Sequence, residues 1–100
     1  METDLDYDGL TPISVRVTRR DGRYLFSDEG GAVAAAGVDP AELSFPDRIP
    51  LGQYSVNVSK QGVAWLPAFA SQGEAWLERV ATIVAEGSLV LYESLLSLED

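Results

Sequence analysis

The chain of 100 residues contains no cysteine and no histidine. Without cysteine it has no disulfide, no thiolate nucleophile and no cysteine-based metal site, which suits the reducing cytosol. Without histidine it lacks the side chain that most often moves protons near neutral pH and most often binds metals. Serine and threonine hydroxyls have no histidine to activate them, and Lys60, the single lysine, falls at an expected hairpin tip. We therefore expect a protein that is not an enzyme and that needs no cofactor or metal.

Long apolar runs are also missing. No uninterrupted run approaches the roughly 18 residues that cross a bilayer, and the N-terminal "METDLDYDGL" is acidic where a signal peptide is basic and then apolar. We expect a cytoplasmic protein with no membrane partner. An apolar content of 46% fits one compact domain stabilised by a single core.

Basic residues are scarce, and the net charge is −9. Residues 1–10 contain four acids and no base, residues 11–60 contain six of each, and residues 61–100 contain six acids against Arg79 alone. A chain of this charge is soluble and repels a phosphate backbone. We therefore expect no direct binding to nucleic acid.

Residues 13–26 alternate between apolar and polar side chains, as a β-hairpin does. Asp21-Gly22 is a strong signal for a two-residue turn, which places Val17 opposite Phe26. Val17 and Phe26 then share the core face with Ile13, Val15 and Tyr24. The opposite face is cationic and carries Ser14, Arg16, Thr18, Arg20, Arg23 and Leu25.

A second hairpin is predicted over residues 54–69, with Gln61-Gly62 as its two-residue turn. Pro67 has no N–H to donate, so we expect its strand to lie at a sheet edge or to end there. This register predicts one face made of Tyr54, Val56, Val58, Val63, Trp65 and Phe69, and another made of Ser55, Asn57, Ser59, Ala64, Leu66 and Ala68.

Helices are predicted on either side of the second hairpin. The run "GGAVAAAG" is typical of a short helix closed by Gly37, and Asp39-Pro40 can begin one helical turn. Pro46 and Pro50 should keep the following residues irregular or extended. A long amphipathic helix is predicted after the second hairpin.

The long helix is predicted to open at Ser71-Gln72-Gly73-Glu74, which reads as a capping box, and to run to Leu98. Gly87-Ser88 can kink it or break it in two. Its apolar arc is wider than the roughly 100° that a one-sided surface helix needs. Something must therefore cover the remaining apolar flank.

The predicted order is strand, strand, short helix, strand, strand, long helix. We expect an α+β fold in which a four-stranded, mainly antiparallel sheet is covered on one face by the short helix and the long C-terminal helix. Residues 1–10 are expected to be a flexible acidic tail, and residues 11–100 a single domain.

This order of elements, with Asp28-Glu29-Gly30-Gly31 after the second strand, resembles a family of uncharacterised small domains of bacterial and phage proteins. The resemblance covers about residues 12–98. It implies a similar arrangement of hairpins and helices in a bacterial or phage protein, and it implies no catalytic residues.

The stretch from Ser27 to Gly31 has two interpretations. Asp28 and Glu29 beside two glycines are compatible with a cation site, although Ca²⁺ needs six or more oxygens and Mg²⁺ needs convergent carboxylates or phosphates. The interpretation that we favour is a structural turn made by Asp28, Gly30 and Gly31, in which Ser27 or Asp28 caps the short helix.

The cationic face of the first hairpin also has two interpretations. Arg16, Arg20 and Arg23 are suited to contact a carboxylate-rich or phosphate-rich partner. The plainer interpretation, which we favour, is a solvated sheet face, because exposed charges contribute little energy.

The apolar flank of the long helix is the main functional signal, because contiguous exposed apolar patches mark interaction sites. Internal packing of this flank is the alternative. The residues expected to take part in protein interaction are Leu89, Tyr92, Leu96, Trp76, Ile83 and Val90.

Three functions follow from these patterns. The favoured hypothesis is a non-catalytic cytosolic protein-interaction domain of the inhibitor, immunity or chaperone-like kind, which forms a homodimer or binds an unidentified protein through the C-terminal helix. The alternative is an acidic decoy that imitates nucleic acid and inhibits a DNA- or RNA-binding protein. A metal-assisted hydrolase centred on Asp28 and Glu29 ranks last.

Overall fold

The computed structural model describes residues 1–98. Within them the chain has an α+β fold, with short 3-10 turns at Pro40–Glu42 and Ala70–Gln72. The strands and α-helices in chain order are β1 (Glu2–Asp6), β2 (Pro12–Ser14), β3 (Arg16–Arg20), β4 (Arg23–Ser27), α1 (Gly31–Ala36), β5 (Arg48–Leu51), β6 (Tyr54–Val58), β7 (Ala64–Phe69) and α2 (Glu74–Ser97).

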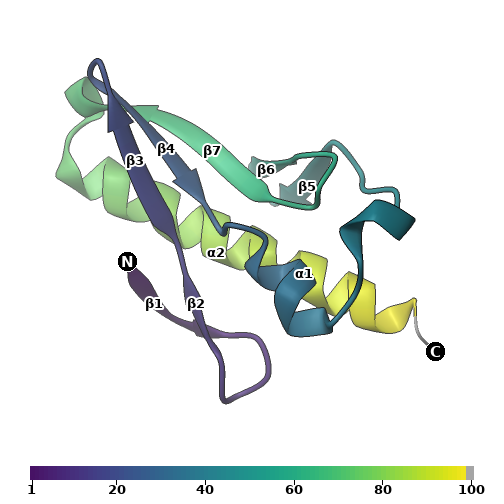
Figure 1. Ribbon diagram of the computed structural model, residues 1–100. Helices are drawn as coiled ribbons and strands as arrows, with labels where there is room; N and C mark the ends of the chain where they lie inside the picture. Colours follow the sequence, from purple (N-terminus) through teal and green to yellow (C-terminus); the bar gives the residue numbers. More distant parts are fainter. Residues whose placement is uncertain (99–100) are drawn as a thin grey trace.

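The strands form two antiparallel sheets. The main sheet has five strands in the order β3-β4-β7-β6-β5, and β1 pairs with β2 in a separate two-stranded sheet. The long helix α2 runs beneath the main sheet, and α1 packs beside the second half of α2 (Figure 1). One face of the main sheet is therefore covered by helix, as the sequence predicts.

The four-stranded sheet predicted from the sequence is wrong by one strand, because β5 forms in the proline-containing segment. β5 lies at the edge of the sheet, where its one neighbour is β6. A proline is tolerated in an edge strand because one side of that strand makes no ladder hydrogen bonds. Pro50 is therefore compatible with β5 and does not prevent it.

The flexible tail expected for residues 1–10 is also wrong, because Glu2–Asp6 form β1. The Met1 amino group donates a 2.9 Å hydrogen bond to the Val15 carbonyl, and the Thr3 hydroxyl donates one of 2.8 Å to the Ile13 carbonyl. Leu5 and Tyr7 pack against the core. The non-acidic residues that alternate with the acids form one side of β1, and this side packs against the rest of the protein. The acidic composition of the segment does not reveal this alternation.

The first hairpin has the predicted register, with Val17 opposite Phe26 and Arg20 opposite Arg23. Asp21 and Gly22 both have positive φ, at 52° and 76°. Two such residues make the turn whose twist matches that of the flanking strands. The local sequence therefore determined this register.

The second hairpin is shifted by one residue from the predicted register. The Ser59 N–H donates to the Val63 carbonyl at 3.0 Å, so the loop has three residues and ends at Gly62 with φ 80°. A one-residue shift exchanges the two faces of a strand. The core side of β7 consequently carries Ala64, Leu66 and Ala68, whereas Val63, Trp65 and Phe69 belong to the opposite face.

Pro67 lies in the interior strand β7, which has β4 on one side and β6 on the other. β7 pairs with β6 only at Trp65 and Ala64. At Pro67 the strand pairs with β4 alone, opposite Leu25. The expected edge position is thus wrong for the strand as a whole, although the proline avoids the two-sided part of the ladder.

The capping box expected at the start of α2 does not form. Gly73 precedes the helix without a side-chain cap, and the Gln72 side chain instead accepts a 2.8 Å hydrogen bond from the Phe69 N–H. α2 continues without a break through Gly87 and Ser88. A Cβ built on Gly87 would lie 2.7 Å from Val56 Cγ2, so this glycine lets the helix approach β6 closely.

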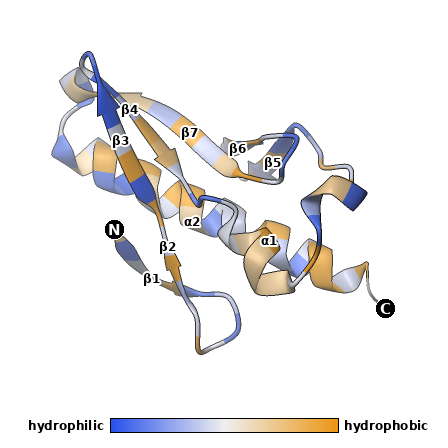
Figure 2. Cartoon of the chain, in the orientation of Figure 1, coloured by the Kyte–Doolittle hydropathy of each residue, from blue (hydrophilic) through white to orange (hydrophobic). Residues whose placement is uncertain are grey.

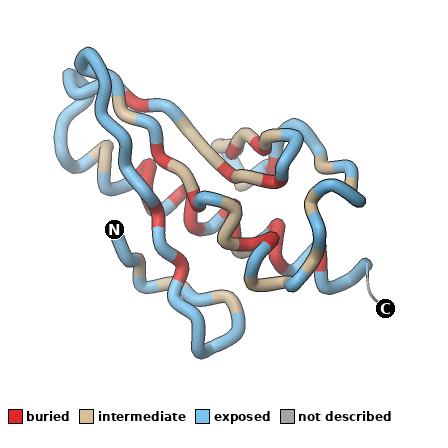
Figure 3. Tube along the Cα trace, viewed as in Figure 1, coloured by how far each residue is buried: buried red, intermediate tan, exposed pale blue. Residues whose placement is uncertain are grey.

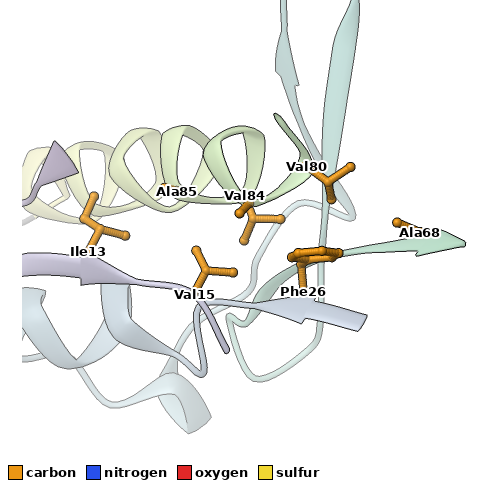
Figure 4. Close-up of a cluster of buried hydrophobic side chains, with 8 residues drawn as sticks. Ile13, Val15, Phe26, Ala68, Val80, Val84 and Ala85 are labelled. Carbon is orange, nitrogen blue, oxygen red and sulfur yellow. The ribbon is translucent and has the colours of Figure 1, made fainter. Parts of the chain in front are cut away.

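The core follows the buried side of α2 along its length (Figure 3). The first half of α2 packs against β1, β2, β4 and β7 through a cluster that Figure 4 shows, which includes Ile13, Val15, Phe26, Ala68, Val80, Val84 and Ala85. Its second half packs against α1, β5 and β6; α1 is apolar along its whole length (Figure 2) and buries Ala32 and Val33.

By length and composition, α2 would suffice to cross a membrane, with a mean hydropathy of 1.3 over its most apolar 18 residues. However, 56% of that segment is buried inside the fold. A core helix of a small compact domain has the same properties, and here the apolar side of α2 is occupied by the chain's own sheet.

Candidate functional site

The face of the five-stranded sheet that points away from α2 carries a regular set of side chains. Cross-strand partners lie on the same face, so the register defines its rows. One row crosses all five strands, from Arg16 through Ser27, Trp65 and Asn57 to Arg48. Two shorter rows complete it on β3, β4 and β7: Thr18, Leu25 and Pro67, then Arg20, Arg23 and Phe69. We call this surface the outer face.

The outer face combines arginines with exposed apolar groups and contains no acidic residue among its strand positions. Phe69 is 48% exposed and Leu25 is 43% exposed, although both are large apolar side chains. Trp65 and Val63 are half-buried. Four of the seven basic residues of the chain, at positions 16, 20, 23 and 48, lie here. The charge of this acidic protein is thus strongly segregated.

Two neighbouring hollows lie on the outer face and share Leu25. The larger, of about 650 Å³, is lined by Thr18, Arg20, Asp21, Arg23, Tyr24, Leu25 and Pro67. The smaller, of about 390 Å³, is lined by Leu25, Ser27, Ser59, Val63 and Trp65. One hollow is therefore cationic on its walls, and its neighbour is mainly apolar.

The three arginines predicted as an anion-contact face differ in their surroundings. Arg16 donates to Glu29 at 2.8 Å in an exposed ion pair, which contributes little energy. The guanidinium of Arg23 lies 5.8 Å from the centre of the Phe69 ring, a cation–π distance. Arg20 and Arg23 face each other across the β3–β4 hairpin, and both line the larger hollow.

The residues predicted for protein interaction on the C-terminal helix do not form one exposed surface. Ile83 and Tyr92 are buried, and Trp76 and Leu89 are half-buried. Only Val90 and Leu96 are exposed, at 38% and 39%. The interaction surface predicted at Ile83 and Tyr92 is therefore wrong: Ile83 packs on Val56 and Ala64, and Tyr92 on the cluster that α1 and β5 contribute.

The predicted structural turn lies where β4 meets α1. The expectation that Ser27 or Asp28 caps the helix is wrong, because Gly30 is the N-cap residue and no side chain caps α1. The Asp28 side chain is 4% exposed. Oδ1 accepts hydrogen bonds from the Gly30 N–H at 2.9 Å and from the Ala64 N–H at 3.0 Å. Oδ2 accepts one of 2.6 Å from the Ser88 hydroxyl. Asp28 therefore joins its own turn to β7 and to α2.

The network continues to the N-terminal segment, since the Tyr7 and Ser88 hydroxyl oxygens are 2.6 Å apart. With Asp28 ionised, Ser88 donates to the carboxylate and accepts from Tyr7. Burial raises the pKa of Asp28 above its usual value, although its hydrogen bonds from Ser88, Gly30 and Ala64 oppose this shift. Burial likewise raises the pKa of Tyr7.

Gly31 has a role in this network that its position in the sequence does not reveal. A Cβ at Gly31 would lie 2.5 Å from the Tyr7 hydroxyl oxygen, so only glycine leaves room for the tyrosine to reach Ser88. Ser88 is fully buried. The Tyr7–Ser88–Asp28 network is thus closed to substrates and acts as an internal clasp.

The cation site considered at Asp28 and Glu29 finds no geometric support in the described residues. Both carboxylates are engaged, Asp28 by the clasp and Glu29 by Arg16. Residues 1–98 contain no group of three or more acidic side chains placed to hold a metal. Oxygen-rich coordination of Mg²⁺ or Ca²⁺ requires such convergence.

Sequence reasoning missed Trp65, Phe69 and Ser88 as parts of these sites. A two-residue turn at Gln61-Gly62 predicts that Trp65 and Phe69 share a face with Val56 and Val58, but the observed register of β7 places them on the opposite face. A three-residue loop closed by glycine in the left-handed conformation is the other common hairpin, and it would have placed them correctly. Ser88, a lone serine on a helix, carries no sequence signal for its contact with Asp28.

Comparisons of the chain with protein-family models, with curated proteins and with solved structures each return no match. The resemblance to small bacterial and phage domains stays a prediction.

Proposed function

We propose that this chain is a non-catalytic protein-interaction domain and that its docking surface is the outer face of the main sheet. The observation that carries the proposal is the combination of exposed Phe69 and Leu25 with half-buried Trp65 and flanking arginines on a sheet face that no described element covers. Tryptophan and arginine are enriched among residues that dominate binding energy.

The sequence predicts the interaction surface on the C-terminal helix, and we propose it instead on the sheet. Most apolar residues of α2 are buried in the chain's own core, whereas no large side chain of the outer face is completely buried. The exposed pair Val90 and Leu96 on α2 is smaller and lacks flanking basic residues. An exposed mixed patch of aromatic and arginine side chains is the stronger docking signal.

The test compares two variants in affinity purification from the native host. The double variant Trp65→Ser/Phe69→Ser removes the aromatic part of the outer face, and Val90→Ser/Leu96→Ser removes exposed apolar groups of α2 as a matched control. We expect the first to lose the partner at least tenfold and the second to retain it, with binding then measured on the purified pair by calorimetry. Loss with the α2 variant and retention with the sheet variant would contradict the proposal.

A further inference from the structure

We infer that the outer face binds a short acidic polypeptide segment that presents one carboxylate and, two residues away, one apolar side chain. This inference rests on the proposed function and specifies the chemistry of its partner. Three observations carry it: the charge of the face, the size of the face and the arrangement of its two hollows.

The charge of the face selects an anionic partner. The outer face carries Arg16, Arg20, Arg23 and Arg48 and no acid at its strand positions, in a chain whose net charge is −9. Two acids lie at its margin, Glu29 paired with Arg16 and Asp21 at the hairpin turn. Charge complementarity guides a partner to one surface and disfavours the others. An acidic segment is therefore attracted here and repelled by the acid-bearing remainder, within a screening length of about 8 Å at physiological salt.

The same charges disfavour two other occupants. A second copy related by two-fold symmetry would bring the same arginine-bearing face against itself, and that face has no acid at its strand positions to pair with those arginines. A nucleic acid carries one negative charge per nucleotide, and each of these charges is repelled by the net negative charge of the protein. The total repulsion is therefore larger than for a peptide with one or two carboxylates. The peptide gains the arginine contacts with the least repulsion from the rest of the chain.

The size of the face suits a segment better than a folded domain. A five-residue strand is about 17 Å long, and five strands span about 19 Å, so the face is on the order of 300 Å² in projection. A standard stable interface needs about 800 Å² from each partner. A single extended segment of about five or six residues matches the smaller area.

The two hollows determine the pattern of side chains. They meet at Leu25 and follow one another along β4, the first beside Arg23 and the second beside Ser27. Alternate residues of an extended segment lie on the same side, about 6.8 Å apart. A carboxylate in the first hollow reaches Arg20 and Arg23, while the residue two positions away enters the mainly apolar hollow at Trp65. Asp21 also lines the first hollow. Its negative charge repels carboxylates, so the hollow accommodates one carboxylate of the segment more readily than two.

The probe is a synthetic blocked pentapeptide, Glu-Ser-Leu-Ser-Glu, whose pattern reads identically in both chain directions. Titration is followed by two-dimensional amide NMR of the full chain. We expect the Trp65 indole N–H and the amides of β4 and β7 to shift, with those of α2 unmoved. Arg20→Gln/Arg23→Gln should weaken binding about five- to tenfold, because a charge-assisted contact is lost. Arg79→Gln on α2, the matched control, should leave the affinity unchanged.

Other outcomes would overturn the inference. These are no shift of the Trp65 indole at millimolar peptide, equal binding of Lys-Ser-Leu-Ser-Lys or Glu-Ser-Ser-Ser-Glu, tighter binding of oligothymidylate, and a dimer in light scattering that protects Trp65. If the purified partner depends on Trp65 and Phe69 while the acidic peptide fails, the proposed function stands and this inference falls. If neither depends on the outer face, both fall.

Discussion

At the scale of single residues, Asp28 stands out as the one buried acidic side chain among residues 1–98. A carboxyl group of 4% exposure is stable inside a protein only when its oxygens are satisfied, and here Gly30, Ala64 and Ser88 all donate to it. Its neighbours belong to a turn, a strand and a helix. The residue therefore stabilises the arrangement of three elements rather than one helix end.

Replacing Asp28 tests this role. Asp28→Ala removes both acceptors and leaves buried N–H groups unpaired, so we expect a loss of about 3 kcal/mol in the free energy of unfolding, measured with urea. Asp28→Asn keeps one acceptor oxygen and should lose about 1 kcal/mol. Equal stability of the alanine variant and the parent would show that the clasp contributes nothing.

The pH dependence of the Asp28→Asn variant gives a second, independent check. Because the folded chain raises the pKa of Asp28, the protonated form favours folding. Its contribution is complete below the unfolded pKa of about 4 and decreases as the pH rises through the folded value. The stability advantage of the parent over Asp28→Asn should therefore be larger at pH 3 than at pH 7. An advantage that grows with pH would contradict the direction of this shift.

At the scale of elements, the close approach of α2 to β6 depends on a missing side chain. Gly87 faces Val56, which is fully buried, and an added Cβ would lie 2.7 Å from its Cγ2. A glycine inside a helix is usually unfavourable by about 1 kcal/mol relative to alanine. At position 87 glycine is expected to be the more stable residue, because the methyl group of alanine would clash with Val56.

Gly87→Ala should consequently destabilise the protein by about 1–3 kcal/mol in urea unfolding, although alanine is the better helix former. Val56→Ala in the same chain should restore only part of the loss, because it removes the two clashing methyl groups but keeps Cβ, which would lie 2.9 Å from the added Cβ. Ser94→Ala, at an exposed position of the same helix, is the control and should change stability by less than about 0.5 kcal/mol. A stabilising Gly87→Ala would disprove the close approach.

At the scale of the whole molecule, the N-terminal segment belongs to the fold. Met1, just before β1, donates a hydrogen bond to Val15, just after β2, and Tyr7, just after β1, joins the clasp at Ser88. Leu5 and Tyr7 also pack against the main hydrophobic cluster, and Tyr7 lies 5.2 Å from the Tyr92 ring. An acidic N-terminus thus serves as a strand with a buried side.

Removal of residues 1–7 should therefore cost about 2–4 kcal/mol, mainly through lost apolar burial and the lost hydrogen bond to Ser88. Thermal unfolding followed by circular dichroism measures the effect. The substitutions Glu2→Gln and Asp4→Asn, which keep the strand, are the control and should leave the midpoint nearly unchanged. If the midpoint of thermal unfolding were unchanged after truncation, residues 1–7 would not contribute to the stability of the fold.

Charge is also arranged at the scale of the whole molecule. Two acidic ends and a neutral middle that contains six of the seven basic residues are evident from the sequence. The sequence does not show that four arginines share a sheet face with no acid at its strand positions. That placement results from the pairing of β3, β4, β7, β6 and β5. It is the basis of the docking surface and of the acidic partner proposed for it.

Features that depend on local contacts could be predicted from the order of the residues alone. The Asp21-Gly22 hairpin, the end of α1 at Gly37 and the turn that begins at Asp39-Pro40 each depend on the conformational preferences of two or three adjacent residues. The amphipathic pattern of α2 likewise depends on spacing within one element.

Four other features appear only once the chain is folded: the pairing of β5, the pairing of β1, the register of β7 and the burial of Asp28. Each depends on contacts between residues far apart in the chain, whose energies no local pattern contains. Trp65 points away from α2 because the alanines at 64 and 68 let the helix lie close to the sheet. The proposed docking surface follows from that packing, which leaves Trp65 and Phe69 on the opposite face of the sheet.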